Sequence, residues 1–307
     1  MNSKNAICNL SAALSTRLDR LILNQNQNQD QNPNVPSGAS PGRFIVAALL
    51  SREPVLIEFS SEFASGNQPD PLVELIASAI KGSVVHDFEP VPGVSERALP
   101  PRSIFFVRNL NRLPVKMMFE AMQLIAEPGE MPLVTIATCD RNERYLPLME
   151  AARDRFGIST RLKMAPSQGT TGKTTAQLAS ASELVAMQAA VNAVELPEQL
   201  KHYLVSLVRA TRPDGSEHSF VCSREGKLRG IIQTGASVRS ILSLAATARA
   251  MAAMNGRDEV SAEDIQAACL PVLEHRIILT AWACQRQVSV ADALAMIVEH
   301  TPVDGIQ

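Results

Sequence analysis

Apolar residues change their spacing near residue 165 of this chain. Before that point, short apolar runs at 55–59, 104–107 and 133–137 alternate with segments whose apolar residues recur at helical spacing. Such an alternation is typical of parallel strands joined by crossover helices. The pattern therefore predicts an α/β domain over 38–164, with helices at 43–52, 71–81 and 115–126.

After a Ser/Thr/Gly-rich linker at 165–180, strand-like runs nearly vanish. Ala/Leu-rich segments at helical spacing follow, and Ser261 with Glu263 and Asp264 has the composition of a helix start. We therefore expect an all-α domain over 181–307. Its predicted helices cover 182–194, 197–211, 236–254, 261–270 and 289–299.

The first residues form a separate unit in this pattern. Apolar residues at helical spacing predict an amphipathic helix within 1–23, and 24–37 is a low-complexity linker rich in Asn and Gln. Because no core lies nearby in the sequence, the apolar face of this helix is a secondary candidate for binding a partner.

Composition narrows the function classes. The 307 residues carry a formal net charge of −2, so no overall basic field favours nucleic acid as a partner. The longest apolar run, 44–50, is far shorter than the roughly 18 residues that span a bilayer. Five scattered cysteines without a CxxC motif suggest reduced thiols. We expect a cytoplasmic protein whose partners are proteins.

The most informative motif is PRSIFFVRNLNRLPVK at 101–116, where the apolar run 104–107 ends in Arg108 and Asn109. It resembles the Walker B segment of the MoxR family of AAA+ ATPases, which has Asp-Glu at that pair and then an INRAPPK-like run. Three further segments are similar to the same family: VTIATCD at 134–140, LPLMEAARDRF at 146–156, and most specifically 234–280, which resembles the family's lid. The resemblance implies an AAA+-like parallel sheet domain followed by an all-α lid domain.

Several positions lack the residue that the chemistry implied by the resemblance requires. A cation at Arg108 would repel Mg²⁺, and Asn109 cannot act as a base for an attacking water. Asp140 replaces the sensor 1 Asn and adds negative charge where a γ-phosphate would lie. We therefore expect no metal site and no cofactor.

A degenerate P-loop is expected at 37–44, with Gly42, Arg43 and Phe44 at the positions that contact phosphate and Mg²⁺. Phe44 has no hydroxyl for a metal, and the linker replaces the strand that should precede the loop. The GTTGKT run at 169–174 looks like the end of a P-loop, but it lacks the first glycine and the preceding strand, so we interpret it as linker.

Two positions keep the family's residue. The resemblance makes Arg155 a possible arginine finger, which acts in trans on a neighbouring subunit's nucleotide, and Arg239 the sensor 2 residue. Ordinary roles remain open: Arg155 pairing with Asp154 or Glu150 on a solvated face, and Arg239 capping the lid helix.

The favoured hypothesis is a pseudo-ATPase that serves as a structural or regulatory subunit of an oligomer. It would assemble with itself or with an active AAA+ paralogue. The alternative is an active MoxR-type ATPase chaperone that uses ATP and Mg²⁺ to assist the maturation or assembly of protein complexes.

Overall fold

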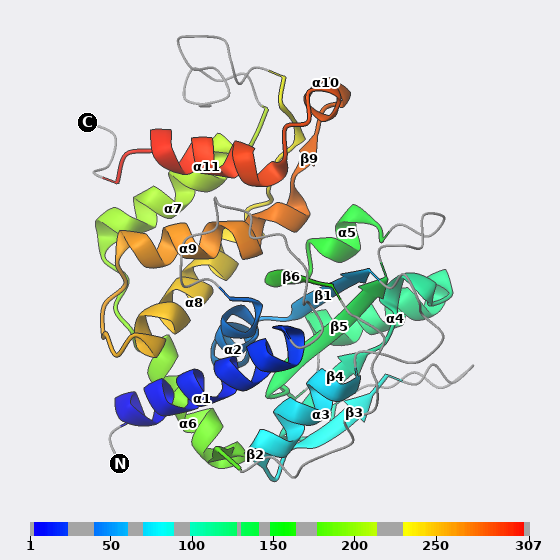
Figure 1. Ribbon diagram of the computed structural model, residues 1–307, viewed down its shortest axis with the longest axis vertical. Helices are drawn as coiled ribbons and strands as arrows, with labels where there is room; N and C mark the ends of the chain where they lie inside the picture. The colour runs from blue at the N-terminus through cyan, green and yellow to red at the C-terminus, as the bar shows by residue number, and fades with distance from the viewer. Residues whose placement is uncertain are drawn as a thin grey trace.

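The computed structural model describes residues 3–23, 40–60, 70–88, 99–127, 130–140, 148–163, 177–213 and 230–303. At its centre lies a five-stranded parallel sheet with the order β3-β4-β5-β1-β6 (Figure 1). The predicted strands at 55–59, 104–107 and 133–137 are confirmed, and the predicted α/β class with them. The strands are β1 (Val55–Ser60), β3 (Val84–Asp87), β4 (Ser103–Val107), β5 (Val134–Asp140) and β6 (Ile158–Lys163).

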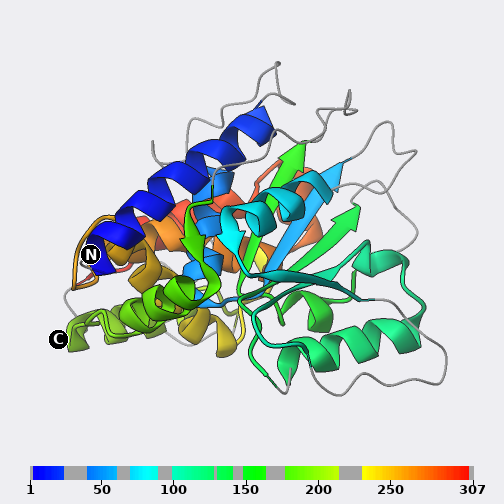
Figure 2. The same ribbon diagram turned by 90° about the horizontal axis from the view of Figure 1, so that it is seen from below.

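Strand β4 shows why an unbroken apolar run marks the middle of this sheet. Ile104 and Phe106 point into one apolar cluster, and Phe105 and Val107 point into a second cluster on the opposite face. Figure 2 shows helices on both sides of the strands. The first face is covered by α2 (Pro41–Ser51) and α3 (Asp70–Ala79), and the second by α4 (Val115–Ala126) and α5 (Glu150–Arg153).

The predicted helical region after residue 181 is confirmed, although it also contains the short strands β8 and β9 described below. Three of its helices begin at local caps: the Ser180 and Ser289 hydroxyls accept hydrogen bonds from the third helical N–H, and Asp264 accepts one from the Ser261 N–H. The helices are α6 (Ala181–Asn192), α7 (Glu198–Ala210), α8 (Arg239–Met254), α9 (Ala262–Leu273), α10 (Ala281–Gln285) and α11 (Val290–His300).

Short elements complete the fold. Strand β2 (Ile80–Lys81) pairs with β7 (Ala179–Ser180), and β8 (Ile232–Thr234) pairs antiparallel with β9 (Ile278–Leu279). Two 3₁₀ turns, η1 (Leu110–Arg112) and η3 (Glu274–Arg276), follow β4 and α9. Within the described residues, no helix is long and apolar enough to cross a membrane.

Helix α1 (Ser3–Leu23) lies along α2 and α8 (Figures 1 and 2). Its apolar side chains Ile7, Leu10, Leu14 and Leu18 are buried. The contact with α2 is close: the Gly42 N–H donates to the Asp19 carboxylate over 2.9 Å, and a Cβ on Gly42 would lie 2.8 Å from the Ser15 carbonyl oxygen. The amphipathic helix is confirmed, but the hypothesis that its apolar face is free for a partner is wrong.

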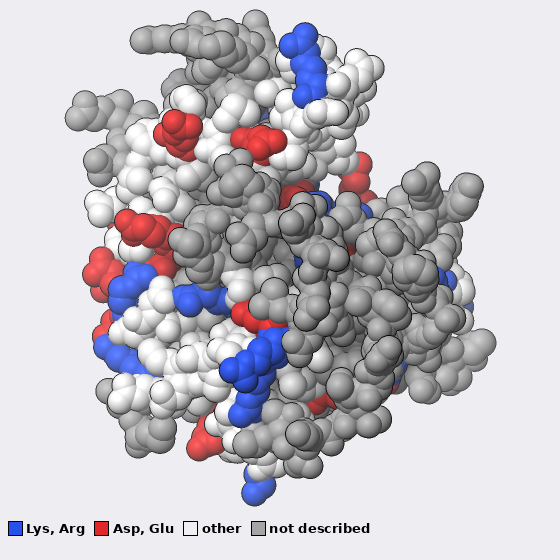
Figure 3. Space-filling model, viewed as in Figure 1, with Lys and Arg blue, Asp and Glu red and all other residues white. Residues whose placement is uncertain are grey.

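One apolar cluster joins α1, α2, the sheet and the lid helices. The predicted linker 24–37 lies outside the described residues, as does 165–176, so the proposed boundaries at 38–164 and 181–307 stay predictions. On the face drawn in Figure 3, basic and acidic side chains of the described residues are interspersed.

Candidate functional site

The carboxyl edge of the sheet brings together the last residues of β3 and β5 and the residues that follow β4. Arg108 donates through Nη2 to Asp87 Oδ2 over 2.9 Å, and its guanidinium lies 5.1 Å from the centre of the Phe106 ring. Asn109 has a left-handed backbone (φ 43°), and its N–H donates to Thr138 Oγ1 over 2.9 Å. The cation of Arg108 is therefore anchored to the end of the neighbouring strand.

The second carboxylate of this edge is also engaged. Asp140 is 3% exposed, and its Oδ2 accepts from Arg112 Nη2 over 3.2 Å. Asn111 bonds both main-chain groups of Asp140, donating to its oxygen over 3.0 Å and accepting from its N–H over 3.2 Å. The predicted sensor 1 position thus lies at the expected edge, with its added charge held by an arginine.

These residues do not fit a Mg²⁺–triphosphate. Mg²⁺ prefers carboxylate and other oxygen ligands, but the described carboxylates near this edge, Asp87, Asp140 and the buried Glu58 of β1, are each already paired with an arginine. Among the described residues, no group of three His, Cys, Asp or Glu side chains is arranged to hold a metal ion.

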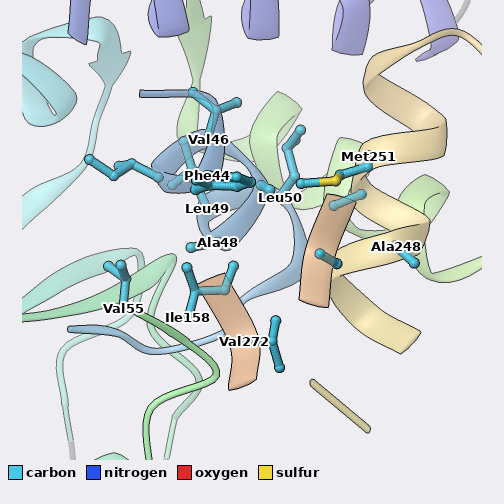
Figure 4. Packing of buried hydrophobic residues seen from close by; sticks show 14 of the residues in the cluster. Phe44, Val46, Ala48, Leu49, Leu50, Val55, Ile158, Ala248, Met251 and Val272 are labelled. Carbon is cyan, nitrogen blue, oxygen red and sulfur yellow. The ribbon is translucent and has the colours of Figure 1, made fainter. Parts of the chain in front are cut away.

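The assignment of Gly42, Arg43 and Phe44 to a P-loop is wrong. They lie in the first turn of α2, where the Ser40 hydroxyl accepts from the Arg43 N–H over 3.2 Å. Phe44 is 7% exposed and packs in the core with Val46, Leu49 and Met251 (Figure 4). A phosphate loop follows the carboxyl end of a strand, whereas α2 precedes β1.

A strand for such a loop is present, contrary to the prediction. Strand β1 lies between β5 and β6 and leads through 61–69 to α3, which is the strand–loop–helix order of a P-loop. The segment 61–69 itself lies outside the described residues. Its sequence, SEFASGNQP, has one glycine and no lysine, so it lacks GxxxxGK[ST]. The GTTGKT run at 169–174 also lies outside the described residues.

The two family-like arginines, Arg155 and Arg239, lie at the opposite end of the strands. Here the N–H groups of Gly157 and Ile158 donate to the Pro54 carbonyl just before β1. Arg155 is exposed, and among the described residues its side chain has no bonding partner. Pairing of Arg155 with Asp154 or Glu150 is not observed.

Arg239 is the first residue of α8, and its Nη1 donates to Asp154 Oδ2 over 3.0 Å. Its guanidinium bonds a side chain of the α/β region and not the lid helix, so the capping role is wrong. Asp154 therefore links Arg239 to the segment that carries Arg155.

The lid also clamps the segment that carries Arg155. His275 Nε2 lies 3.0 Å from the Phe156 carbonyl oxygen, and Arg276 Nη2 donates to the same oxygen over 2.6 Å. Burial lowers the pKa of His275 to about 3, with the positive charge of Arg276 a smaller cause, so the ring is neutral and its N–H donates. This bond was not predicted from the sequence.

Asp154 is the centre of the contact. Its Oδ1 accepts from the Ser237 hydroxyl over 2.7 Å and lies 3.6 Å from Arg276 Nε. Arg276 itself has a side chain only 1% exposed. A cavity of about 370 Å³ opens beside these groups between α5 and the lid, lined by Leu148, Arg153, Ile278 and their neighbours. Sequence reasoning missed Arg276, although it lies in one of the two family-like segments that meet here.

Comparison with known proteins agrees with this arrangement. Residues 229–296 match the model of the AAA lid domain. The chaperone MoxR1 of Mycobacterium tuberculosis (strain ATCC 25618 / H37Rv) is 29% identical over 204 residues, which cover 59% of this chain and 52% of that protein. The chain is therefore similar to MoxR-type AAA+ proteins.

Solved structures place this MoxR-like protein in the same fold. The crystal structure of a candidate ATPase from Cytophaga hutchinsonii ATCC 33406 superposes with a TM-score of 0.68 at 20% identity, covering 95% of this chain and 96% of that one. A full-length MCM homologue from Methanopyrus kandleri gives 0.53 at 15% identity, covering 90% and 62%. The MoxR-like protein spans about half the length of MoxR1.

Proposed function

We propose that this MoxR-like protein does not hydrolyse ATP and acts as a structural or regulatory subunit of an oligomeric assembly. The observation that carries the proposal is the ion pair between Arg108 and Asp87 at the position of the family's metal-binding acid. Three changes to the catalytic constellation support it: a cation at the metal position, an amide in place of the base, and no lysine in the segment after β1.

The position of Arg155 supports the second half of the proposal. Arg155 acts on no phosphate of its own chain, because it lies at the amino ends of the strands while a nucleotide would bind at their carboxyl ends. A finger residue that serves a neighbouring subunit keeps its use when its own chain's site is lost. A subunit that assists another is therefore expected to lose its own nucleotide site at the carboxyl ends and to keep Arg155 at the amino ends.

Steady-state ATP hydrolysis by the purified full chain tests the proposal. We expect no turnover above a protein-free control, with or without Mg²⁺. The matched variant is Arg108→Asp combined with Asn109→Glu, which restores the two acidic positions. It should also be inactive, because the segment 61–69 still lacks the lysine and glycine spacing that bind phosphate.

Turnover by the wild-type chain would overturn the proposal and favour the alternative, an active ATPase chaperone. This alternative is supported by the name of the relative MoxR1, which is a chaperone. Turnover by the double variant alone would show that only the Walker B positions have been lost.

A further inference from the structure

The two edges of the central sheet differ in what covers them. Strand β6 forms one edge, where it contacts α9 and where Arg161 pairs with Glu274 of η3. Strand β3 forms the other edge (Figure 1), and its main contacts among the described elements are with β4 and α3. Its first two residues are exposed, Val84 by 56% and Val85 by 37%. Because successive residues of a strand point to opposite faces, the start of β3 is open on both faces of the sheet.

The main chain of β3 presents hydrogen-bonding groups outward. On the inner side, the Val84 N–H donates to the Arg102 carbonyl oxygen over 3.4 Å, and the Phe88 N–H also donates to β4. Alternate residues of a strand face its neighbour, so the N–H and C=O groups of Val85 and Asp87 point to the open edge. Such unpaired groups are a template for the addition of another strand.

Strand β3 has few of the features that protect an edge strand from pairing. Residues 84–87 contain no proline and no lysine, and they pair one-to-one with β4 without a bulge. The Asp87 carboxylate is bound by Arg108, and the His86 ring stacks on Phe105 with 6.0 Å between the ring centres. Both polar side chains of the strand are therefore engaged by β4 and the residue after it. The strand has only four residues, so it suits a short partner segment.

Two cations lie where β3 begins. Arg102 accepts the first main-chain bond of the strand, and Lys81 ends the preceding strand β2. Both side chains are exposed, and neither has a hydrogen bond or ion pair among the described residues. Helix α3 carries the acidic residues Glu74 and Asp70, but both come before its last turn at Ala79 and so lie further from Lys81 along the helix. The start of β3 is therefore complementary to a negative charge.

We propose that the open edge of β3 binds a short extended segment of a partner protein by strand addition. The main chain of the segment pairs with the outward groups of Val85 and Asp87, and its side chains contact Val84 and Val85. Lys81 and Arg102 select an acidic residue at the nearby end of the segment. Main-chain groups aligned along a strand edge are satisfied by an extended chain and not by a helix, whose own main-chain groups bond within it. The inference goes beyond the proposed function, because no nucleotide takes part in it.

Selection from a random peptide library displayed on phage, with the purified full chain as target, tests this inference. We expect peptides in which β-branched or aromatic residues alternate with polar residues and which carry Asp or Glu near one end. The discriminating variant is Val85→Pro, which removes an outward N–H and none of the donors to β4. Fluorescence anisotropy of a selected peptide should show about tenfold weaker binding to Val85→Pro. Val85→Thr, the matched control, keeps the N–H and should keep the affinity.

A further variant tests the charge. Lys81→Glu should weaken binding of the same peptide several-fold at low salt, and the difference should shrink at high salt because exposed charges are screened. Equal binding to Lys81→Glu and wild type at low salt would contradict the acidic partner.

Amide hydrogen exchange gives a readout that does not depend on the folding of a variant. The amides of Val85 and Asp87 should exchange more slowly in the wild-type chain when the peptide is bound, whereas that of Val84, which already donates to β4, should change little. Unchanged exchange at Val85 and Asp87 would overturn the inference, as would equal affinity for a folded Val85→Pro or a library that yields no such peptide.

Self-association of the chain is a separate outcome. A dimer that is present in the wild type and lost in Val85→Pro would overturn the inference, because a second copy of the chain would then occupy the edge. None of these measurements involves ATP hydrolysis. Failure of the inference is therefore distinguishable from failure of the proposed function.

Discussion

The two ends of the parallel strands differ in how their charges are used. At the carboxyl edge, Arg108 and Arg112 are each paired with a carboxylate of the same edge. At the amino ends, Arg155 is exposed without a bonding partner among the described residues, and the segment around it is braced by Arg276 from the lid. The described charges of the carboxyl edge neutralise one another, whereas Arg155 presents a cation to solvent.

The difference separates two properties that an active AAA+ subunit combines. Binding a nucleotide requires free carboxylates and a phosphate loop, and assisting a neighbour requires only a positioned cation. On the proposed function, this chain lacks the first set of groups and keeps the second. The lid explains how: it holds the finger segment through the Phe156 carbonyl, which needs no nucleotide.

The largest expected effect concerns the finger. Replacing Arg155→Ala should lower the ATPase rate of the partner subunit by about 10³-fold or more, because the cation that stabilises the transition-state charge is lost. The free energy of unfolding of this chain should change little, since the side chain is exposed. The measurement is the partner's turnover in the reconstituted complex. An unchanged rate would reduce Arg155 to an ordinary surface arginine.

Phe44→Thr distinguishes a core residue from a phosphate-loop residue. Because Phe44 is buried beside Leu49 and Met251, the substitution should reduce the free energy of unfolding by about 3–4 kcal/mol. Urea denaturation measures the loss, and Phe44→Leu is the control that should cost much less. A neutral Phe44→Thr would contradict the placement of α2 in the core.

Removing the lid's clamp should be nearly as costly. Arg276→Met leaves Asp154 with one cation and the Phe156 carbonyl with one donor, so we expect a loss of about 3 kcal/mol in urea denaturation. Arg276→Lys keeps the charge but lacks the planar guanidinium, so its free energy of unfolding should lie between those of wild type and Arg276→Met. Arg239→Ala, at the exposed pair with Asp154, should cost less than about 1 kcal/mol. Equal losses of stability for Arg276→Met and Arg239→Ala would contradict a special stabilising role for the bonds of Arg276.

Acid should weaken the same contact through His275. Its pKa is lowered to about 3 in the folded chain, while the unfolded chain binds a proton near the ordinary value of 6.5. The unfolded state therefore holds more protons between these values, and stability falls as the pH falls from about 6.5 towards 3, by up to about 1.4 kcal/mol per pH unit. Denaturation at several pH values should show a shallower slope for His275→Gln. Identical slopes would mean that His275 is not buried and neutral.

The local spacing of apolar residues predicted much of this fold. The runs 104–107 and 133–137 are apolar because both faces of β4 and β5 are buried, and that signal is visible in the sequence alone. Strands β3 and β6 were not predicted, since His86 and Asp87 interrupt one and Ser159 to Arg161 interrupt the other. An edge strand needs no unbroken apolar run.

The errors came from contacts between distant segments. The apolar face of α1 is covered by α8, more than 200 residues away, and no local pattern shows that contact. The phosphate loop was sought at 37–44 because of glycines there, but strand order places it after β1. At the site, Arg108 and Arg155 were recognised from short motifs. Their surroundings, Asp87 and Arg276, depend on which strands and helices pack together.

Calorimetric titration of the purified full chain with ATP and Mg²⁺ tests the central claim most directly, because it asks whether the carboxyl edge binds a nucleotide at all. The account predicts no measurable binding, since the described carboxylates near this edge, Asp87, Asp140 and Glu58, are each paired with an arginine. Repeating the titration with Arg155→Ala controls for weak attraction of phosphate to the exposed Arg155. Micromolar affinity that persists in Arg155→Ala would contradict the account, because it would show that the edge retains a working nucleotide site.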